Sequence, residues 1–168
     1  MIPDNSYDII VVGAGPAGST AAMYAAERGM SVLLVDKKKD IGTPLQWGGF
    51  LPHYETLKEL VPNAELPPTL EKIPASCIHT STSYQRFIAP DGVSKGFHVN
   101  ADAIDRRRFD KHLAMLAGKA GAQILVGTNV LEVNGTELLM DGAFGEFPVK
   151  AKVIIGADGP NSIVAKAN

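Results

Sequence analysis

The fold is decided by residues 7–36, whose sequence is YDIIVVGAGPAGSTAAMYAAERGMSVLLVD. Its first part, Tyr7–Val12, is a short apolar run rich in β-branched residues, typical of a strand buried on both faces. The alanine-rich stretch Ser19–Arg28 predicts a helix that Gly29 ends, and Ser31–Val35 predicts a second buried strand. Strand, helix and strand within about thirty residues predict a βαβ unit with two parallel strands.

A glycine-rich turn of the form G-x-G-x-x-G joins the first strand to the helix. In this pattern Gly13 permits a tight turn, Gly15 lets the backbone approach a pyrophosphate, and Gly18 allows close packing of helix and strand. The helix start offers free N–H groups to the phosphates. Asp36, at the end of the second strand, can accept hydrogen bonds from both ribose hydroxyls of an adenosine, and it would repel a 2′-phosphate. A chance glycine turn would lack this context, so the segment predicts a dinucleotide site.

The middle of the chain changes character. Residues 40–75 contain repeated prolines and glycines, which predicts a long functional loop with a short helix around Glu55–Leu60. Residues 76–100 predict short antiparallel strands with a turn at Pro90–Gly92.

The C-terminal part returns to alternating helix and strand. Asp105–Lys119 has apolar residues at helical spacing and predicts a helix capped by its first residue. Gln123–Val126 predicts another strand of the parallel sheet, and residues 129–149 predict a small meander with a turn at Asp141-Gly142. Val153–Ile155 predicts the last buried strand. We therefore expect an α/β, Rossmann-like fold: a parallel sheet with a small antiparallel meander and an insertion.

Composition sets limits on function. The 168 residues include 45% hydrophobic and 20% charged residues, an ordinary balance for a soluble globular domain. The net charge of −2 gives no basic field for nucleic acid. Cys77 is the only cysteine, which excludes an internal disulfide and favours a packed thiol. No apolar stretch is long enough to span a bilayer. The four histidines show no metal-ligand spacing, so no metal is expected.

A second motif, GADGPNS, follows the last predicted strand at residues 156–162. On its own it is also consistent with a simple Asp-Gly turn. Together with the glycine turn it resembles the second fingerprint, G-A-D-G-x-x-S, of glutathione-reductase-like flavoproteins of the aromatic hydroxylase and geranylgeranyl reductase type. The resemblance implies that FAD is the cofactor. It also implies that Asp158 forms a hydrogen bond with a ribityl hydroxyl, and that Gly159 allows a close approach near the pyrophosphate.

A third pattern narrows the resemblance. The sequence beginning at Arg106 fits R-x-x-F-D-x-x-L, with Phe109 and Asp110 at the F and D positions. It resembles the geranylgeranyl reductase family, including archaeal enzymes that saturate isoprenoid chains of membrane lipids. The resemblance implies that Arg106 lies near the FAD phosphates, whereas Arg107 and Arg108 are interpreted as a solvated helix start.

The loop GTPLQWGGF at residues 42–50 departs from the family, which carries a cysteine where this chain has Trp47. Trp47 could stack on the isoalloxazine ring or merely pack. Gly48 and Gly49 could let the backbone approach that ring. The remaining candidates for contact with the cofactor are Pro16, Ala17, Lys37 and Val130.

The resemblance also implies an organisation. Residues 1–168 are expected to be one FAD-binding domain, with the βαβ unit at 7–40, an insertion at 41–100 and the remainder of the fold at 101–168. The insertion would supply at most one wall of a substrate pocket. Proteins of the family are longer, so we expect this chain to be truncated relative to them.

The function implied is an FAD-dependent reductase of isoprenoid double bonds, although no residue stands out as a catalytic acid or base. An FAD monooxygenase or a quinone-linked dehydrogenase on the same fold is an alternative, and so is a non-catalytic FAD-binding chain. A small-molecule or isoprenoid lipid substrate is expected, with no nucleic acid and with no indication of the electron donor. We expect a cytoplasmic protein; a membrane-lipid substrate would add peripheral membrane contact, although no amphipathic anchor helix is evident.

Overall fold

The computed structural model describes residues 6–44, 48–143 and 145–167. It divides into two compact units, which are described separately. The first unit comprises residues 1–44 and 110–168, and the second comprises residues 45–109. The second unit overlaps the insertion expected at 41–100 and continues into the start of the following helix.

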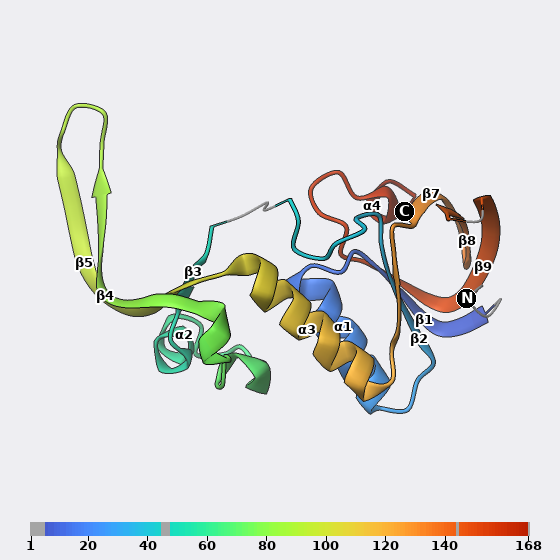
Figure 1. Cartoon of the computed structure of the whole chain (residues 1–168), viewed down its shortest axis with the longest axis horizontal. Coiled ribbons are helices and arrows are strands. Elements are labelled where there is room, and N and C mark those ends of the chain that lie inside the picture. The colour runs from blue at the N-terminus through green and yellow to red at the C-terminus, as the bar shows by residue number, and fades with distance from the viewer. Residues whose placement is uncertain (1–5, 45–47, 144, 168) are drawn as a thin grey trace. The chain divides into compact units, whose positions relative to one another are not determined.

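The first unit is built on a six-stranded sheet in the order β6-β2-β1-β9-β8-β7 (Figure 1). Its strands are β1 Ser6–Val12, β2 Val32–Asp36, β6 Gln123–Val126, β7 Asn129–Asn134, β8 Glu137–Gly142 and β9 Gly145–Gly156. Strand β1 runs parallel to β2 and β9, and β2 runs parallel to β6. The βαβ unit and the strand at 123–126 are thereby confirmed.

Strand β9 is longer than the expected Val153–Ile155, because it belongs to two parts of the sheet. Its beginning pairs antiparallel with β8, and its end pairs parallel with β1. The predicted meander at 129–149 is therefore continuous with the parallel sheet through one strand.

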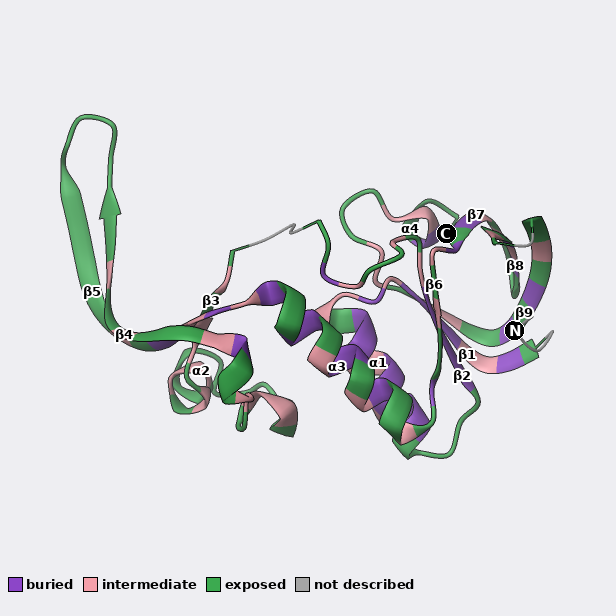
Figure 2. Ribbon diagram, viewed as in Figure 1, coloured by how far each residue is buried: buried purple, intermediate pink, exposed green. Residues whose placement is uncertain are grey.

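Three helices belong wholly or partly to this unit: α1 Pro16–Glu27, α3 Arg106–Ala120 and α4 Ile163–Lys166. Helix α1 begins earlier than the expected Ser19, because proline suits the first turn of a helix. Figures 1 and 2 show α1 and α3 side by side. Small side chains such as Ala22 and Ala117 let them pack against Val11 and Leu34. A second cluster, which includes Ile10, fills the other face of the sheet.

The second unit contains a three-stranded antiparallel sheet in the order β3-β5-β4. Its elements are β3 Phe50–Pro52, α2 Tyr54–Leu60, β4 Ile78–Ile88, β5 Ser94–Ile104 and two 3₁₀ turns at Pro68–Leu70 and Ala75–Cys77. The expected helix and antiparallel strands are confirmed, but β4 and β5 are 11 residues each rather than short. Neither glycine nor proline interrupts β4, so nothing in its sequence ends it early. The turn between them carries Gly92 at φ +84°, as predicted for 90–92.

Within the part of the chain that the structure describes, none of the helices has both the length and the apolar character needed to cross a membrane.

Candidate functional site

The glycine turn lies at the carboxyl end of β1, where α1 begins. Two of its glycines have a structural reason: a Cβ on Gly13 would collide with the backbone oxygen of Ala157, and one on Gly18 would collide with that of Gly13. Gly13 also has a φ of +102°, which disfavours any other residue. A Cβ on Gly15, by contrast, would meet no atom within 4 Å. Gly15 therefore faces open space, as the approach of a phosphate group requires.

Asp36 holds this turn from the neighbouring strand. Its Oδ2 accepts a hydrogen bond from the Ala14 N–H at 2.7 Å, and its Oδ1 accepts one from the Lys38 N–H at 2.8 Å. Neither contact was predicted from the sequence. A carboxylate has about four acceptor positions, so Asp36 retains capacity for the ribose hydroxyls predicted above.

Asp158 lies beside the same turn, since a Cβ on Gly13 would come within 2.9 Å of its Cα. Its Oδ2 accepts a hydrogen bond from the Ile163 N–H at 2.7 Å. Its Oδ1 is buried and has no hydrogen-bond partner among the described residues. A buried acceptor without a donor costs about 1–3 kcal/mol. This atom is therefore placed to accept a hydrogen bond from a ligand.

The last residue of the second motif has a role that sequence analysis missed. Ser162 is the N-cap of α4, and its Oγ accepts a hydrogen bond from the Ala165 N–H at 3.0 Å. Gly156 allows the close approach of this helix, because a Cβ there would lie 2.8 Å from Cβ of Val164. A serine placed just before a helix-forming stretch is the signal that could have identified this cap.

Most of the other predicted cofactor-binding residues also belong to the first unit. Pro16 is the first residue of α1, Ala17 is exposed in its first turn, and Gly159 is exposed with a φ of +88°. Lys37 is exposed directly after Asp36. Val130 departs from this pattern, because its side chain lies in the hydrophobic core and leaves only its backbone for a ligand.

Arg106, Gly48 and Gly49 belong to the second unit. Arg106 is only 5% exposed at the start of α3, whereas Arg107 and Arg108 are exposed, as expected for a solvated helix start. Asp105 caps this helix by accepting hydrogen bonds from the N–H groups of both exposed arginines, as predicted. These hydrogen bonds lower the pKa of the Asp105 carboxyl.

Gly49 has a structural explanation in the second unit. A Cβ there would collide with the backbone oxygen of Ile104, whose N–H donates to the Gly49 oxygen at 2.7 Å. A Cβ on Gly48 would meet nothing within 4 Å. Trp47 lies outside the described residues.

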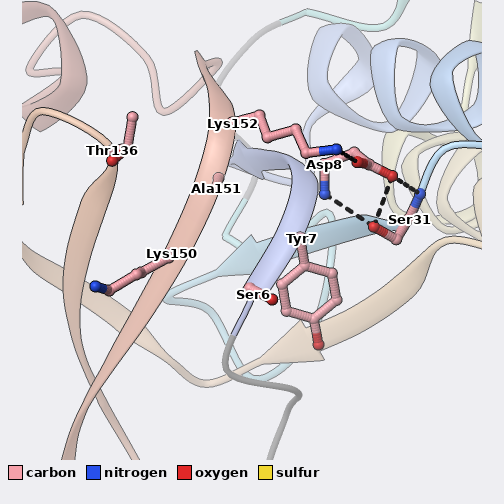
Figure 3. Close-up of a pocket in the computed structure, with 8 residues that line it drawn as sticks. All are labelled: Ser6, Tyr7, Asp8, Ser31, Thr136, Lys150, Ala151 and Lys152. Atoms are coloured by element: carbon pink, nitrogen blue, oxygen red, sulfur yellow. Dashed lines mark hydrogen bonds and ion pairs between the residues drawn. The ribbon is translucent and has the colours of Figure 1, made fainter.

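A separate cleft of about 420 Å³ opens at the amino end of β1, beside the middle of β9 (Figure 3). Asp8 receives hydrogen bonds there from Ser31 and an ion pair from Lys152 at 2.7 Å. The Lys152 ammonium and then Ser31 hold the pKa of the Asp8 carboxyl far below its usual range. Parallel sheets bind ligands at the carboxyl ends of their strands. The glycine turn lies at that end, so this cleft is distinct from the candidate site.

Cys77 is buried, and its burial raises the pKa of the thiol, which confirms the expected packed cysteine. Among the described residues, no group of three or more His, Cys, Asp and Glu side chains is arranged to hold a metal ion.

Residues 8–168 match the family described as FAD dependent oxidoreductase. The chain belongs to this family. The match confirms FAD as the cofactor that the two fingerprints implied.

Individual relatives of this FAD dependent oxidoreductase differ greatly in length. It is 51% identical over 167 residues to an uncharacterized protein in the nifH2 5′ region of Methanosarcina barkeri, covering 99% of this chain and 90% of that protein. It is 38% identical over 168 residues to digeranylgeranylglycerophospholipid reductase 1 of Methanosphaera stadtmanae, covering 95% of this chain but 39% of the reductase. The chain thus spans less than half of that reductase.

A solved structure gives the same result. A geranylgeranyl bacteriochlorophyll reductase-like protein from Thermoplasma acidophilum superposes with a TM-score of 0.76 at 32% identity, covering 92% of this chain and 40% of that one. The resemblance to geranylgeranyl reductases that the motifs indicated is thereby confirmed.

The residues of the oxidoreductase fit FAD on structural grounds. The buried Oδ1 of Asp158 has no donor among the residues that the structure describes, and a hydroxyl group of the cofactor would supply one. Gly15 leaves space before the first turn of α1, and no acidic residue in that turn competes for its N–H groups.

Proposed function

We propose that this chain is the FAD-binding part of a reductase of the geranylgeranyl reductase type, acting on isoprenoid double bonds of membrane lipids. The proposal is carried by the buried Oδ1 of Asp158, which has no hydrogen-bond partner among the described residues, and the open space at Gly15 supports it. The names of the relatives support the substrate class, since the Methanosphaera stadtmanae protein is a digeranylgeranylglycerophospholipid reductase.

Each group of the first unit has a part in binding. The free N–H groups at the start of α1 bind the pyrophosphate, which Gly15 allows to come close. Asp36 accepts hydrogen bonds from the adenosine ribose while it holds the turn through Ala14. Asp158 accepts a hydrogen bond from a ribityl hydroxyl. FAD, when bound, supplies the hydride transfer chemistry, and the protein binds and orients it.

The insertion at residues 41–100 is proposed to supply part of the substrate-binding surface, and Arg106 is proposed to bind the cofactor phosphates. For a lipid substrate, we propose a cytoplasmic protein that contacts the membrane surface peripherally.

Flavin titration tests the proposal directly. The purified chain is expected to acquire the visible absorption bands of oxidised flavin when FAD is added. Asp158→Ala should weaken FAD binding by about 1.5–3 kcal/mol, or roughly 10- to 150-fold in Kd, because it removes an acceptor in a charge-assisted hydrogen bond. Asp141→Ala, which removes an exposed carboxylate of β8, is the matched control and should leave the Kd unchanged. Equal Kd values for the Asp158 variant and the native chain would refute the assignment.

The Methanosarcina barkeri relative favours a second candidate function, because this chain spans 90% of its length. A chain of this size could bind FAD without turnover of its own. Reduced flavin on the protein, kept without oxygen and mixed with a geranylgeranyl lipid, distinguishes the two. Reoxidation with saturation of the lipid supports the reductase, and flavin that stays reduced supports the binding protein.

A further inference from the structure

The outward face of helix α3 carries charge of one sign only. Every charged residue of α3 that is exposed is a cation, whereas its single acid, Asp110, is buried. Figure 2 shows exposed segments recurring along this helix. We call this side of α3 the cationic face, and its exposed residues are Arg107, Arg108, Lys111, Met115, Gly118 and Lys119.

The spacing of these residues places them in one line along the helix. Arg108, Lys111, Met115 and Lys119 follow one another at intervals of three or four positions, which lie on the same side of an α-helix. From residue 107 to residue 119 the face extends about 18 Å. The opposite side of α3 is held in the core of the first unit, where Ala117 is fully buried. Packing on that side therefore keeps the cations directed outward.

Neighbouring acids neutralise the cationic face only in part. Arg108 pairs with Asp105 at 3.5 Å, and Lys111 pairs with Asp40 at 2.7 Å. No acidic side chain of the described residues pairs with the other two cations of the face. Four cations and two carboxylates leave an excess of two positive charges there, although the chain as a whole has a net charge of −2. Positive charge is thus concentrated on α3.

An apolar side chain lies within this charge. Met115 is 45% exposed, and Lys111 and Lys119 lie four positions before and after it. A nucleic acid would attract the cations but would leave the methionine in water. The surface of an anionic bilayer suits both, because its headgroups attract lysine and arginine and its headgroup–acyl boundary accepts an apolar side chain.

We propose that the cationic face of α3 is the surface by which this chain adsorbs to an anionic phospholipid membrane. The choice of a membrane rests on the proposed function, in which the substrate is a lipid, whereas the face itself rests on the charges and burial of α3. The apolar side of the helix is used in the protein core, so α3 does not insert as an anchor. The contact is therefore electrostatic, reversible and weakened by salt.

Co-sedimentation with vesicles tests the proposal. The chain is expected to bind vesicles that contain phosphatidylglycerol but not vesicles of phosphatidylcholine alone, and added KCl should release it. Arg107→Gln combined with Lys119→Gln should weaken binding about 30-fold, because each cation near an anionic surface contributes about a factor of five. Lys72→Gln combined with Lys95→Gln is the matched control. Both lysines are exposed and lie outside α3, so the same loss of charge there should leave binding unchanged.

A single variant supplies a test in the opposite direction. Asp40→Asn removes the exposed carboxylate that pairs with Lys111, so it should strengthen binding to anionic vesicles about fivefold. Circular dichroism of all variants verifies that they fold. Unchanged or weaker binding by the Asp40 variant would contradict the cationic face as the contact surface.

Four other outcomes overturn the inference: no binding to anionic vesicles, equal weakening by the two double variants, release by phosphate beyond that by chloride at the same ionic strength, or preference for an RNA oligonucleotide over the vesicles. Vesicle binding requires no flavin, and FAD titration is measured separately. Vesicle binding without FAD binding therefore refutes the proposed function alone, and FAD binding without vesicle binding refutes the membrane surface alone.

Discussion

The two units differ in how completely their strands are buried. In the first unit the central strands are buried on both faces, and Ile10 and Leu34 are fully inaccessible to solvent. One buried carboxylate oxygen of this unit, Oδ1 of Asp158, has no hydrogen-bond partner among the described residues. In the second unit the strands leave Phe87 and Ile88 more than half exposed. A single hydroxyl group would satisfy that oxygen, whereas the large apolar side chains of β4 are exposed along the strand. The difference indicates that the packed core beneath the candidate cofactor site belongs to the first unit.

Truncation of core side chains should show the contrast most strongly. Leu34→Ala is expected to lower the free energy of unfolding by about 2–5 kcal/mol, because it leaves a cavity in a fully buried site. Ile88→Ala should change it by less than about 0.5 kcal/mol, since that side chain is mostly in water. Urea denaturation of both variants measures the difference. Equal losses would show that the side chain of Ile88 is packed in solution.

Replacement of Asp36, whose carboxylate holds the glycine turn, tests the predicted contact with the cofactor ribose. Asp36→Ala should weaken FAD binding by about 1.5–3 kcal/mol through lost hydrogen bonds to a charged acceptor. It should also destabilise the protein without FAD, because Ala14 loses its acceptor. Asp40→Ala is the control, since that carboxylate is 56% exposed and pairs with Lys111. Isothermal titration that gave the same affinity for the Asp36 and Asp40 variants would count against the ribose assignment.

Two glycines of the turn are assigned different roles: Gly18 is needed for packing, and Gly15 is needed for the approach of the ligand. Gly18→Ala is expected to cost about 1–3 kcal/mol of stability, because its Cβ would collide with the backbone of Gly13. Gly15→Ala should cost under about 1 kcal/mol, because its Cβ enters open space at the helix start, yet it should weaken FAD binding. Thermal unfolding and FAD titration of both variants give the comparison. A Gly15 variant that retained native FAD affinity would contradict the assigned approach of the pyrophosphate.

The smallest effect is expected at Asp8, far from the cofactor site. Its pKa in the folded protein lies below the ordinary value of 3.8, so its ion pair with Lys152 stabilises the fold above that pH. This contribution is lost as the pH falls below 3.8 towards the lowered pKa of the folded state. Native protein should therefore unfold at a higher temperature than Asp8→Asn at pH 7, and the difference should shrink in acid. A difference independent of pH would exclude the ion pair as its cause.

Local patterns in the sequence predicted the first unit well. The apolar run ending in Val12, the glycines after it and Gly29 each determine their own conformation, so the βαβ unit followed from neighbours in the chain. The cap of α3 by Asp105 and the turn at Gly92 follow from the same short-range chemistry.

Contacts between distant residues could not be predicted. The hydrogen bond from Ala14 to Asp36 joins residues 22 positions apart, and no periodicity encodes it. The close approach of Gly49 to Ile104 likewise depends on strand pairing across the second unit. The length of β4 was underestimated because both of its faces are exposed. The alternation of apolar and polar residues that marks a half-buried strand is therefore weak in its sequence. The cofactor-binding roles themselves, including that of Arg106, stay predictions.

The hydrogen bond between Asp36 and Ala14 has a consequence for binding kinetics. The backbone around the phosphate position is already fixed in the ligand-free protein, so little conformational entropy is lost when a nucleotide arrives. A preorganised cradle of this kind should recognise the ADP moiety alone, with association limited by encounter rather than by rearrangement.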